Sequence, residues 1–297
     1  MEKNKHLYAS KDTRLAYAFC LPIILFSLMF IVVPVFGTLI TSFFRDVTFL
    51  DSQFIAWKNY GRLFSDIQFW QSLRFTLVFV ILSVGLELIL GLIFALLLNE
   101  YLPARGFFRV VMLIPWAIPI AISGRIWEFI YHFEFGLINF LALKTGLLNQ
   151  PINWLGSSDG AFFAIVISDV WKTTPFIAII LLAGLSNIPR ILYSQAMIDG
   201  AGSWQRFYRI TLPLLKPVII VALLFRTIDA IRIFDLIYVL TGGGPGGSTT
   251  SLSLYAFKHY LSGDFGYGSA ISIVIFLTAG MLSILYIKLG RFGEGMR

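Results

Sequence analysis

Residues 15–44 read LAYAFCLPIILFSLMFIVVPVFGTLITSFF, a run of 30 residues without a single Asp, Glu, Lys or Arg. A membrane-spanning helix needs about 20 mostly apolar residues, so this run is long enough to cross a bilayer. Lys3, Lys5, Lys11 and Arg14 precede it. A cleaved signal peptide has a shorter apolar core followed by a small-residue cleavage site. We therefore interpret the run as a retained first spanning helix.

The composition of the whole chain agrees with a membrane protein. Of the 297 residues, 58% are apolar and 13% are charged, whereas about a quarter are charged in soluble domains. The mean hydropathy is +0.82. A water-soluble fold of this size cannot hide so much apolar surface. The single Cys20 and the three widely separated His residues offer neither a disulfide framework nor a metal-binding cluster.

Five further segments are apolar enough to span a bilayer. Because backbone groups cannot stay unpaired in hydrocarbon, each is expected to be a helix. We predict an all-α, polytopic membrane protein in which residues 1–297 form one transmembrane domain. The six predicted spans are residues 15–41, 73–98, 108–131, 161–184, 215–240 and 268–289.

The distribution of Lys and Arg predicts the orientation. With the N-terminus inside, 13 of these residues lie in cytoplasmic segments and 5 in exterior ones. Cytoplasmic loops carry an excess of Lys and Arg, so both termini are predicted to be cytoplasmic. The same bias explains the net charge of +7 without any binding of nucleic acid, which we do not expect.

The interior segment 189–213 has the pattern of two short helices joined by a corner. Pro189 suits the start of a helix over 190–198, and the glycines of Asp199-Gly200-Ala201-Gly202 permit a tight reversal. We predict that Ser203 caps a second helix, which Pro213 ends. Apolar side chains on such a projecting loop suggest a protein partner on the cytoplasmic side; they are Tyr193, Met197, Trp204 and Phe207.

The spacing within this loop resembles a family signature. Ala196, Gly200 and Ile210-x-Leu212-Pro213 fit the pattern Glu-Ala-Ala, three residues, Gly, nine residues, Ile-x-Leu-Pro of permease subunits in ABC importers. Residues 197–202 and 234–245, the latter reading FDLIYVLTGGGP, are similar to the sugar-importing branch that includes maltose, trehalose and glycerol-phosphate permeases. The resemblance extends over essentially the whole chain in the order of its spans.

This resemblance implies that the loop couples the permease to an ATPase. Where the family has Glu-Ala-Ala, this chain has Ser194-Gln195-Ala196. A charge-assisted contact to the ATPase, about twice as strong as a neutral one, would be replaced here by hydroxyl or amide bonding. The residues expected to couple are Ser194, Gln195, Ala196, Asp199, Gly200, Ala201 and Gly202.

The resemblance also implies partners and a location. It implies a second homologous permease subunit, a dimer of ATPase subunits and an extracytoplasmic sugar-binding protein, assembled in a bacterial or archaeal cytoplasmic (inner) membrane. The chain would form half of the translocation path by alternating access and would not be an enzyme. The glycines of residues 242–249 lack the Lys of a phosphate-binding loop, so ATP and Mg are expected on the partner ATPase, with no cofactor in this chain.

Two other classes of protein remain as alternatives. A stand-alone secondary transporter or channel for a small polar solute would also be helical and polytopic, but the loop helices would have no role in it. A membrane-embedded enzyme would need a catalytic constellation, which the scattered His residues and Cys20 do not supply.

Charged residues inside the predicted spans indicate where a polar solute could pass, because such residues usually face a cavity or a partner. They are Glu87, Arg125, Glu128, Asp169, Lys172, Arg226, Asp229, Arg232 and Asp235. The last four occur at steps of three, which on one helix cover half of its circumference. Mutual pairing that merely holds helices together is an equally good explanation. Candidate sugar-binding residues on the fourth and fifth spans are Trp171, Lys172, Phe176, Arg226, Asp229 and Tyr238.

Overall fold

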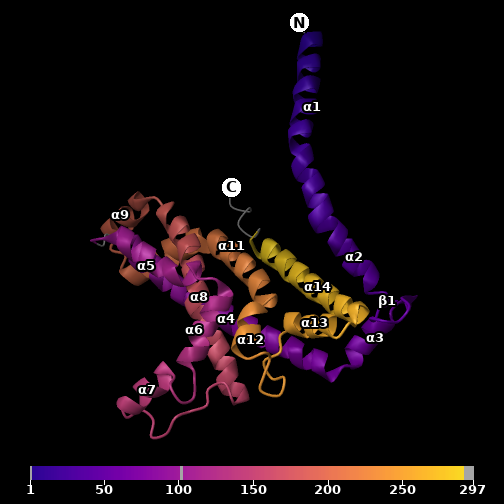
Figure 1. The fold of residues 1–297 in the computed structure, drawn as a ribbon. Helices are drawn as coiled ribbons and strands as arrows, with labels where there is room; N and C mark the ends of the chain where they lie inside the picture. Colours follow the sequence, from indigo (N-terminus) through magenta and orange to yellow (C-terminus); the bar gives the residue numbers. More distant parts are fainter. Residues whose placement is uncertain (1, 101–102, 291–297) are drawn as a thin grey trace.

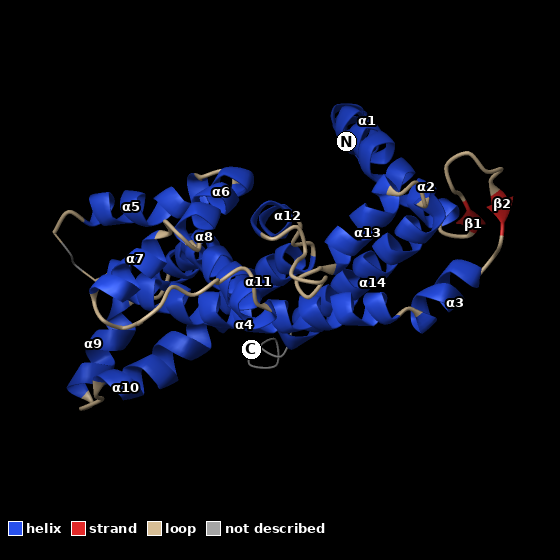
Figure 2. Ribbon diagram, turned by 60° about the horizontal axis from the view of Figure 1, so that its bottom comes forward, coloured by secondary structure: helices blue, strands red, loops and turns tan. Residues whose placement is uncertain are grey.

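A computed structural model describes residues 2–100 and 103–290, and it confirms the all-α prediction (Figure 2). The one sheet among these residues is a pair of two-residue antiparallel strands. The elements, with η denoting a π-helical turn, are α1 (Glu2–Ser27), η1 (Leu28–Val32), α2 (Val33–Thr41), β1 (Phe44–Arg45), β2 (Gln53–Phe54), α3 (Lys58–Ser65), α4 (Ile67–Asn99), α5 (Arg105–Ala117), α6 (Ile120–Ile130), α7 (Leu137–Lys144), α8 (Ser158–Ser186), α9 (Arg190–Ile198), α10 (Ser203–Arg206), η2 (Phe207–Thr211), α11 (Leu212–Ile231), α12 (Asp235–Leu240), α13 (Leu252–Leu261) and α14 (Phe265–Gly290).

Four helical segments among the described residues are long and apolar enough to cross a membrane: Leu15–Thr41, α4, α8 and α14. A fifth is obtained if α5 and α6, which meet at a bend of 90°, count as one span. The sequence predicted a single helix over 108–131, and this prediction is wrong in detail. Pro119 lies in the bend as the N-cap of α6, a position whose N–H makes no hydrogen bond within that helix.

The predicted fifth span, 215–240, is also two helices. α11 ends at Ile231, and α12 begins at Asp235. α11 carries Lys216, Arg226 and Asp229 within 20 residues. It is therefore too highly charged to count as one of the four apolar spanning segments. The total of six spans therefore stays a prediction.

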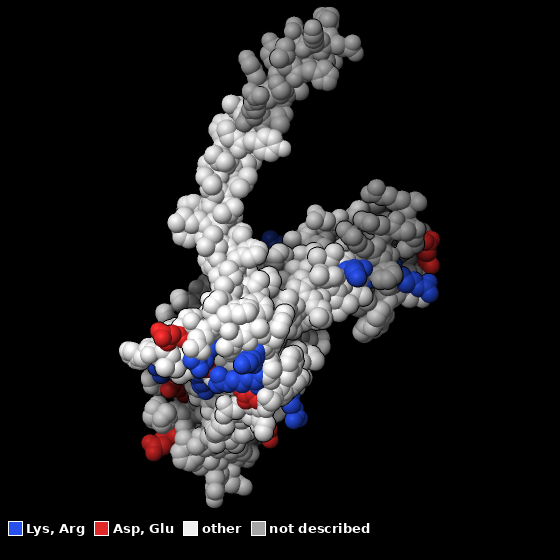
Figure 3. Space-filling model, turned by 90° about the vertical axis from the view of Figure 1, so that its right-hand side faces the viewer, with Lys and Arg blue, Asp and Glu red and all other residues white. Residues whose placement is uncertain are grey.

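The first spanning segment projects away from the rest of the chain. α1, η1 and α2 form one rod (Figure 1), and the most apolar part of Leu15–Thr41 is not buried at all within this chain. Figure 3 shows the described part of this rod as an uncharged surface above a face where basic and acidic side chains gather. Lipid or another subunit must supply the surroundings of such a surface.

At two prolines the helix continues through the proline directly after a π-helical turn. The N–H of Val33 donates to the carbonyl of Leu28, and the N–H of Leu212 donates to that of Phe207, five residues back in both cases. Pro34 and Pro213 follow directly. A wider turn relieves the clash between a proline ring and the carbonyl four residues earlier. The prediction that Pro213 ends a helix is therefore wrong, because η2 continues into α11.

α4 and α8 form the centre of the molecule. Phe79 of α4 and Ile165, Ile177 and Leu181 of α8 are completely buried. Gly91 allows the two helices to approach closely, since a Cβ atom there would lie 2.7 Å from Cγ2 of Ile177. This packing fixes the positions of the polar side chains on the two helices.

The interior loop has the predicted corner. α9 covers Arg190–Ile198 as expected, and Gly200 has a φ of +78°, which glycine adopts without strain. The predicted cap is wrong: Gly202 occupies the N-cap position of α10, and its N–H donates to Oε1 of Gln205 at 3.0 Å. Trp204 is 72% exposed and Met197 52%, whereas Tyr193 and Phe207 are half-buried.

The two ends of the molecule carry different elements. In Figure 1, α9 and the free end of α1 lie toward the top, whereas α7 and the loop between α12 and α13 lie toward the bottom. The interior loop and the glycine-rich loop therefore lie at opposite ends of the central helices.

Candidate functional site

A buried ion cluster joins three helices at Arg226. Its Nη2 donates to Oε1 of Glu87 on α4 at 2.9 Å and to the carboxylate of Asp169 on α8. Its Nη1 donates to Oδ2 of Asp229, one turn further along α11, at 3.3 Å. The Glu87 and Arg226 side chains are at most 3% exposed.

The cluster satisfies the groups that it buries. Charged side chains are tolerated in a low-dielectric interior only when they are paired and hydrogen-bonded. The hydroxyl of Thr173 donates to Oε1 of Glu87 at 2.7 Å, which adds a neutral donor to the two guanidinium donors. The cluster therefore fixes the relative positions of α4, α8 and α11.

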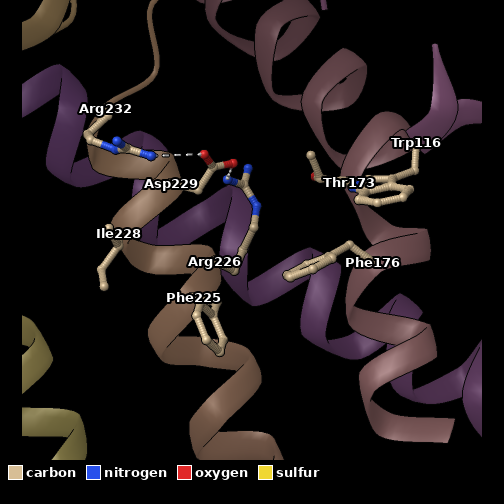
Figure 4. Close-up of a pocket in the computed structure, with 8 residues that line it drawn as sticks. All are labelled: Trp116, Thr173, Phe176, Phe225, Arg226, Ile228, Asp229 and Arg232. Atoms are coloured by element: carbon tan, nitrogen blue, oxygen red, sulfur yellow. Dashed lines mark hydrogen bonds and ion pairs between the residues drawn. The ribbon is translucent and has the colours of Figure 1, made fainter. Parts of the chain in front are cut away.

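A cavity of about 320 Å³ lies beside the cluster (Figure 4). Arg226 and Asp229 come from α11 and Arg232 directly follows it, and Trp116 of α5 lies with Thr173 and Phe176 of α8 across from them in the figure. Phe225 and Ile228 complete the lining. A second cavity of about 80 Å³ shares Thr173, Arg226, Asp229 and Arg232 with the first, and Asp169, Lys172 and Asp235 also line it.

The cavity offers both kinds of contact that a polyhydroxylated solute uses. The side chains of Asp229 and Arg232 are 62% and 64% exposed, and Oδ1 of Asp229 lies 3.7 Å from Nη2 of Arg232. They therefore present a hydrogen-bond acceptor and several donors to a solute in the cavity. The rings of Trp116 and Phe176 are stacked, with centroids 6.1 Å apart. Apolar walls with a few convergent polar groups are typical of small-molecule sites.

The structure brings together part of the predicted sugar-binding set. Phe176, Arg226 and Asp229 line the larger cavity, and Lys172 lines the smaller one. Trp171 instead borders a separate apolar groove and packs edge-on against Trp127. Tyr238 lies on α12, where it stacks on Phe234.

Lys172 caps the interrupted helix. Its ammonium group donates to the carbonyls of Pro115 at 3.4 Å, of Trp116 at 3.3 Å and of Ile118. These carbonyls belong to the last turn of α5 and the residue after it, where no helical N–H is available. A cation at a helix C-terminus also interacts favourably with the helix dipole. In this structure Lys172 therefore stabilises the bend between α5 and α6.

Sequence reasoning left Glu87, Asp169, Thr173 and Trp116 out of the site. Carboxylates within apolar helices did mark Glu87 and Asp169 as unusual, but no local pattern predicts a partner 139 or 57 residues away. Arg232 lies near Asp229, and among the described residues no ion pair joins it to Asp235. The break after α11 explains this, because Asp235 opens the next helix.

A charged cavity between apolar helices, with short exposed helices at one end, is the arrangement expected of a transport permease. Residues 87–289 match the family described as binding-protein-dependent transport system inner membrane component. The chain belongs to this family, and it is a multi-pass transport permease and not an enzyme.

Several curated relatives match over nearly their whole length. The trehalose/maltose transport system permease protein MalF of Thermococcus litoralis is 54% identical over 95% of each chain. The sulfoquinovosyl glycerol transport system permease protein SmoG of Agrobacterium fabrum is 40% identical over 94% of this chain and 91% of its own.

Solved structures of similar fold are also transporters. One is a bacterial ABC transporter involved in the import of the acidic polysaccharide alginate, with a TM-score of 0.84 and 25% identity over 97% of this chain and 99% of that chain. Another is the alginate transporter in complex with an alginate pentasaccharide-bound periplasmic protein, with a TM-score of 0.82 and 26% identity over 95% of each chain.

Proposed function

We propose that this chain is the transmembrane subunit of an ATP-driven importer for an oligosaccharide or glycoside and that it forms half of the translocation path. The observation that carries the proposal is the cavity in which Asp229 and Arg232 face the stacked rings of Trp116 and Phe176. Relatives named for trehalose, maltose and a sulfoquinovosyl glycerol support the substrate class.

The proposed assembly contains a second permease, two ATPase subunits and an extracytoplasmic binding protein in a bacterial or archaeal inner membrane. The exposed loop of α9, α10 and η2 is the proposed docking site of the ATPase. The loop includes the corner Asp199–Gly202 and Ser194, whose hydroxyl donates to the carbonyl of Arg190. Because Ser194 is neutral, the proposed contact with the ATPase depends more on the shape of the loop than on its charge.

The chain path gives a mechanism for coupling. α8 ends at Ser186, just before the loop, and η2 continues directly into α11. Both helices contribute walls of the cavity, Thr173 and Phe176 from α8 and Arg226 and Asp229 from α11. When ATP binding draws the ATPases together, a displaced loop would therefore move both walls, which opens the path outward; hydrolysis would reset it.

Within the cavity we assign different tasks to the predicted residues. The guanidinium of Arg226 is engaged by Glu87, Asp169 and Asp229, so it positions the Asp229 carboxylate. Asp229 and Phe176 are the proposed solute contacts. Lys172 supports the backbone that carries Trp116.

The test of the site is Asp229→Ala in the complete importer, reconstituted in proteoliposomes. Loss of the solute acceptor should reduce sugar uptake about tenfold or more, while the subunits still co-purify. Asp51→Ala, which removes an exposed carboxylate from the segment between β1 and β2, is the matched control. Uptake that stays at the level of this control would remove Asp229 from the site.

The test of coupling is deletion of residues 193–202. Association with the ATPase should be lost, while membrane insertion and pairing with the second permease persist. Uptake driven by a proton or sodium gradient in vesicles without any ATPase would instead establish a secondary transporter and refute the proposal.

A further inference from the structure

A third polar pocket lies at the N-terminal end of α4. Its volume is about 260 Å³, and it is built by the first turns of α4, the glycine-rich loop and α13. Gln68 and Gln71 come from α4, Gly246 and Gly247 from the loop, and Lys258 from α13. It shares no lining residue with the cavity at Arg226, so it is a separate site.

The glycine-rich rim of this pocket is held in one shape. Gly246 and Gly247 have φ values of +57° and +84°, which glycine adopts without a steric penalty. The hydroxyl of Thr249 donates to the carbonyl of Gly244 at 2.6 Å, and the N–H of Thr250 donates to the carbonyl of Gly247 at 3.1 Å. A partner that docks on such a preorganised rim loses little conformational entropy.

The opposite wall is braced by a cluster around Asp66, which caps α4 and accepts a hydrogen bond from the N–H of Gln68. The hydroxyls of Tyr255 on α13 and Tyr267 on α14 donate to its carboxylate. Burial alone would raise the pKa of Asp66, but these hydrogen bonds lower it below its ordinary value. The carboxylate is therefore ionised and already engaged by donors at neutral pH.

The chemistry of the lining favours a negatively charged occupant. Lys258 supplies an ammonium group, 3.4 Å from the hydroxyl of Thr250, and amide donors of Gln68 and Gln71 lie on the same pocket. No Asp or Glu lines the pocket among the described residues. Burial lowers the pKa of His259, although Asp264 opposes this, so the imidazole is neutral at pH 7. Lys258 is then the one formal charge of the lining.

We infer that this pocket is a docking point for the extracytoplasmic binding protein and receives the carboxylate of an Asp or Glu on that protein's surface. The inference rests on the proposed function, because it requires such a partner. The glycine-rich loop that lines the pocket lies at the end of the central helices opposite to α9 (Figure 1), the side that the orientation prediction makes exterior. A similar permease has been solved with a periplasmic protein bound.

The experiment uses the complete importer in proteoliposomes of phosphatidylethanolamine and phosphatidylglycerol, with ATP hydrolysis measured against the concentration of sugar-loaded binding protein. Lys258→Gln should raise the half-maximal concentration about tenfold and leave the maximal and basal rates unchanged, as expected when one partner of a charged contact is lost. Lys258→Arg should stay within about threefold of the wild type. Lys144→Gln, which removes an exposed ammonium from α7 on the same side, is the control.

Two outcomes would overturn the inference: a half-maximal concentration for Lys258→Gln equal to that of the Lys144→Gln control, or a change in the dependence on free sugar at saturating binding protein, which would make the pocket a solute site. Normal stimulation of ATP hydrolysis in the wild-type importer by the sugar-loaded binding protein separates these outcomes from a failure of the proposed function.

Charge reversal identifies the partner residue. Lys258→Glu should weaken stimulation further, and changing single acidic residues of the binding protein to Lys should restore it at one position. If no such variant restores stimulation, the pocket does not receive a carboxylate.

Discussion

Some helices of this protein continue through a proline, and others are interrupted by a break in the backbone; the fold accommodates the two cases in different ways. At Pro34 and Pro213 a π-helical turn precedes the proline and the helix continues. After α5 the backbone bends by 90°, and the ammonium of Lys172 takes the freed carbonyls. α11 stops at Ile231, shortly after the ion cluster that ties it to α4 and α8.

What distinguishes the bend after α5 from the two proline sites is the presence of a charged brace, Lys172. A proline removes one donor, and a wider turn absorbs the loss within the helix. A break exposes several carbonyls at once, and in a membrane these need another protein group as donor. Proline alone therefore does not predict where a membrane helix ends, and four predictions test this interpretation, beginning with the largest expected effect.

Arg226→Met should be the most damaging change. It leaves Glu87 and Asp169 buried without their cation, and breaking a buried ion pair in this way costs about 3–5 kcal/mol. We expect a large loss of folded protein, or a Tm lower by many degrees, measured by thermal melting of the detergent-solubilised importer. The double variant Glu87→Gln, Arg226→Met should recover part of the stability; no recovery would contradict the pairing.

Lys172→Met should have the next largest effect. It leaves the carbonyls at the end of α5 without their donor, at a cost of about 3 kcal/mol. Lys172→Arg keeps the charge and should retain most of the stability. Melting and uptake are measured for both, and equal melting of Lys172→Met and the wild type would show that the bend does not depend on this brace.

Asp66→Ala tests a brace at the start of α4, before the predicted span 73–98. It removes the cap of α4, worth about 1 kcal/mol, together with the bonds from Tyr255 and Tyr267. Because the folded-state pKa is lowered, the stabilisation by the charge is present above the ordinary value of 3.8 and is lost as the pH falls through the folded-state value. The difference in Tm from the wild type should thus shrink below about pH 4; a constant difference would contradict the role of the charge.

Pro213→Ala should have the smallest effect. The π-helical turn already accommodates the ring, so we expect a change in stability below about 1 kcal/mol and normal uptake. A loss comparable to that of Lys172→Met would mean that the proline itself shapes the entry of α11.

The same comparison explains what the sequence could predict. Composition and long apolar runs gave the helical membrane class, and the glycine and proline pattern gave α9 and its corner, because these signals are local. The bend at 118–119 is held by Lys172, and at the break at 232–234 the hydroxyl of Ser251 donates to the carbonyl of Ile233 at 2.7 Å; no local sequence pattern predicts these partners. Of the predicted sugar-binding residues, Phe176, Arg226 and Asp229 line the larger cavity, and Trp171 and Tyr238 line neither of the two cavities; sugar binding by these residues stays a prediction.

The side chain of Lys172 on α8 caps the end of α5 and so determines the bend between α5 and α6. A relative with a neutral residue at the position of Lys172 must either straighten that helix or supply a donor from elsewhere. Lysine and bend should therefore be gained and lost together over evolutionary time, and an alignment in which they vary independently would point to a second donor.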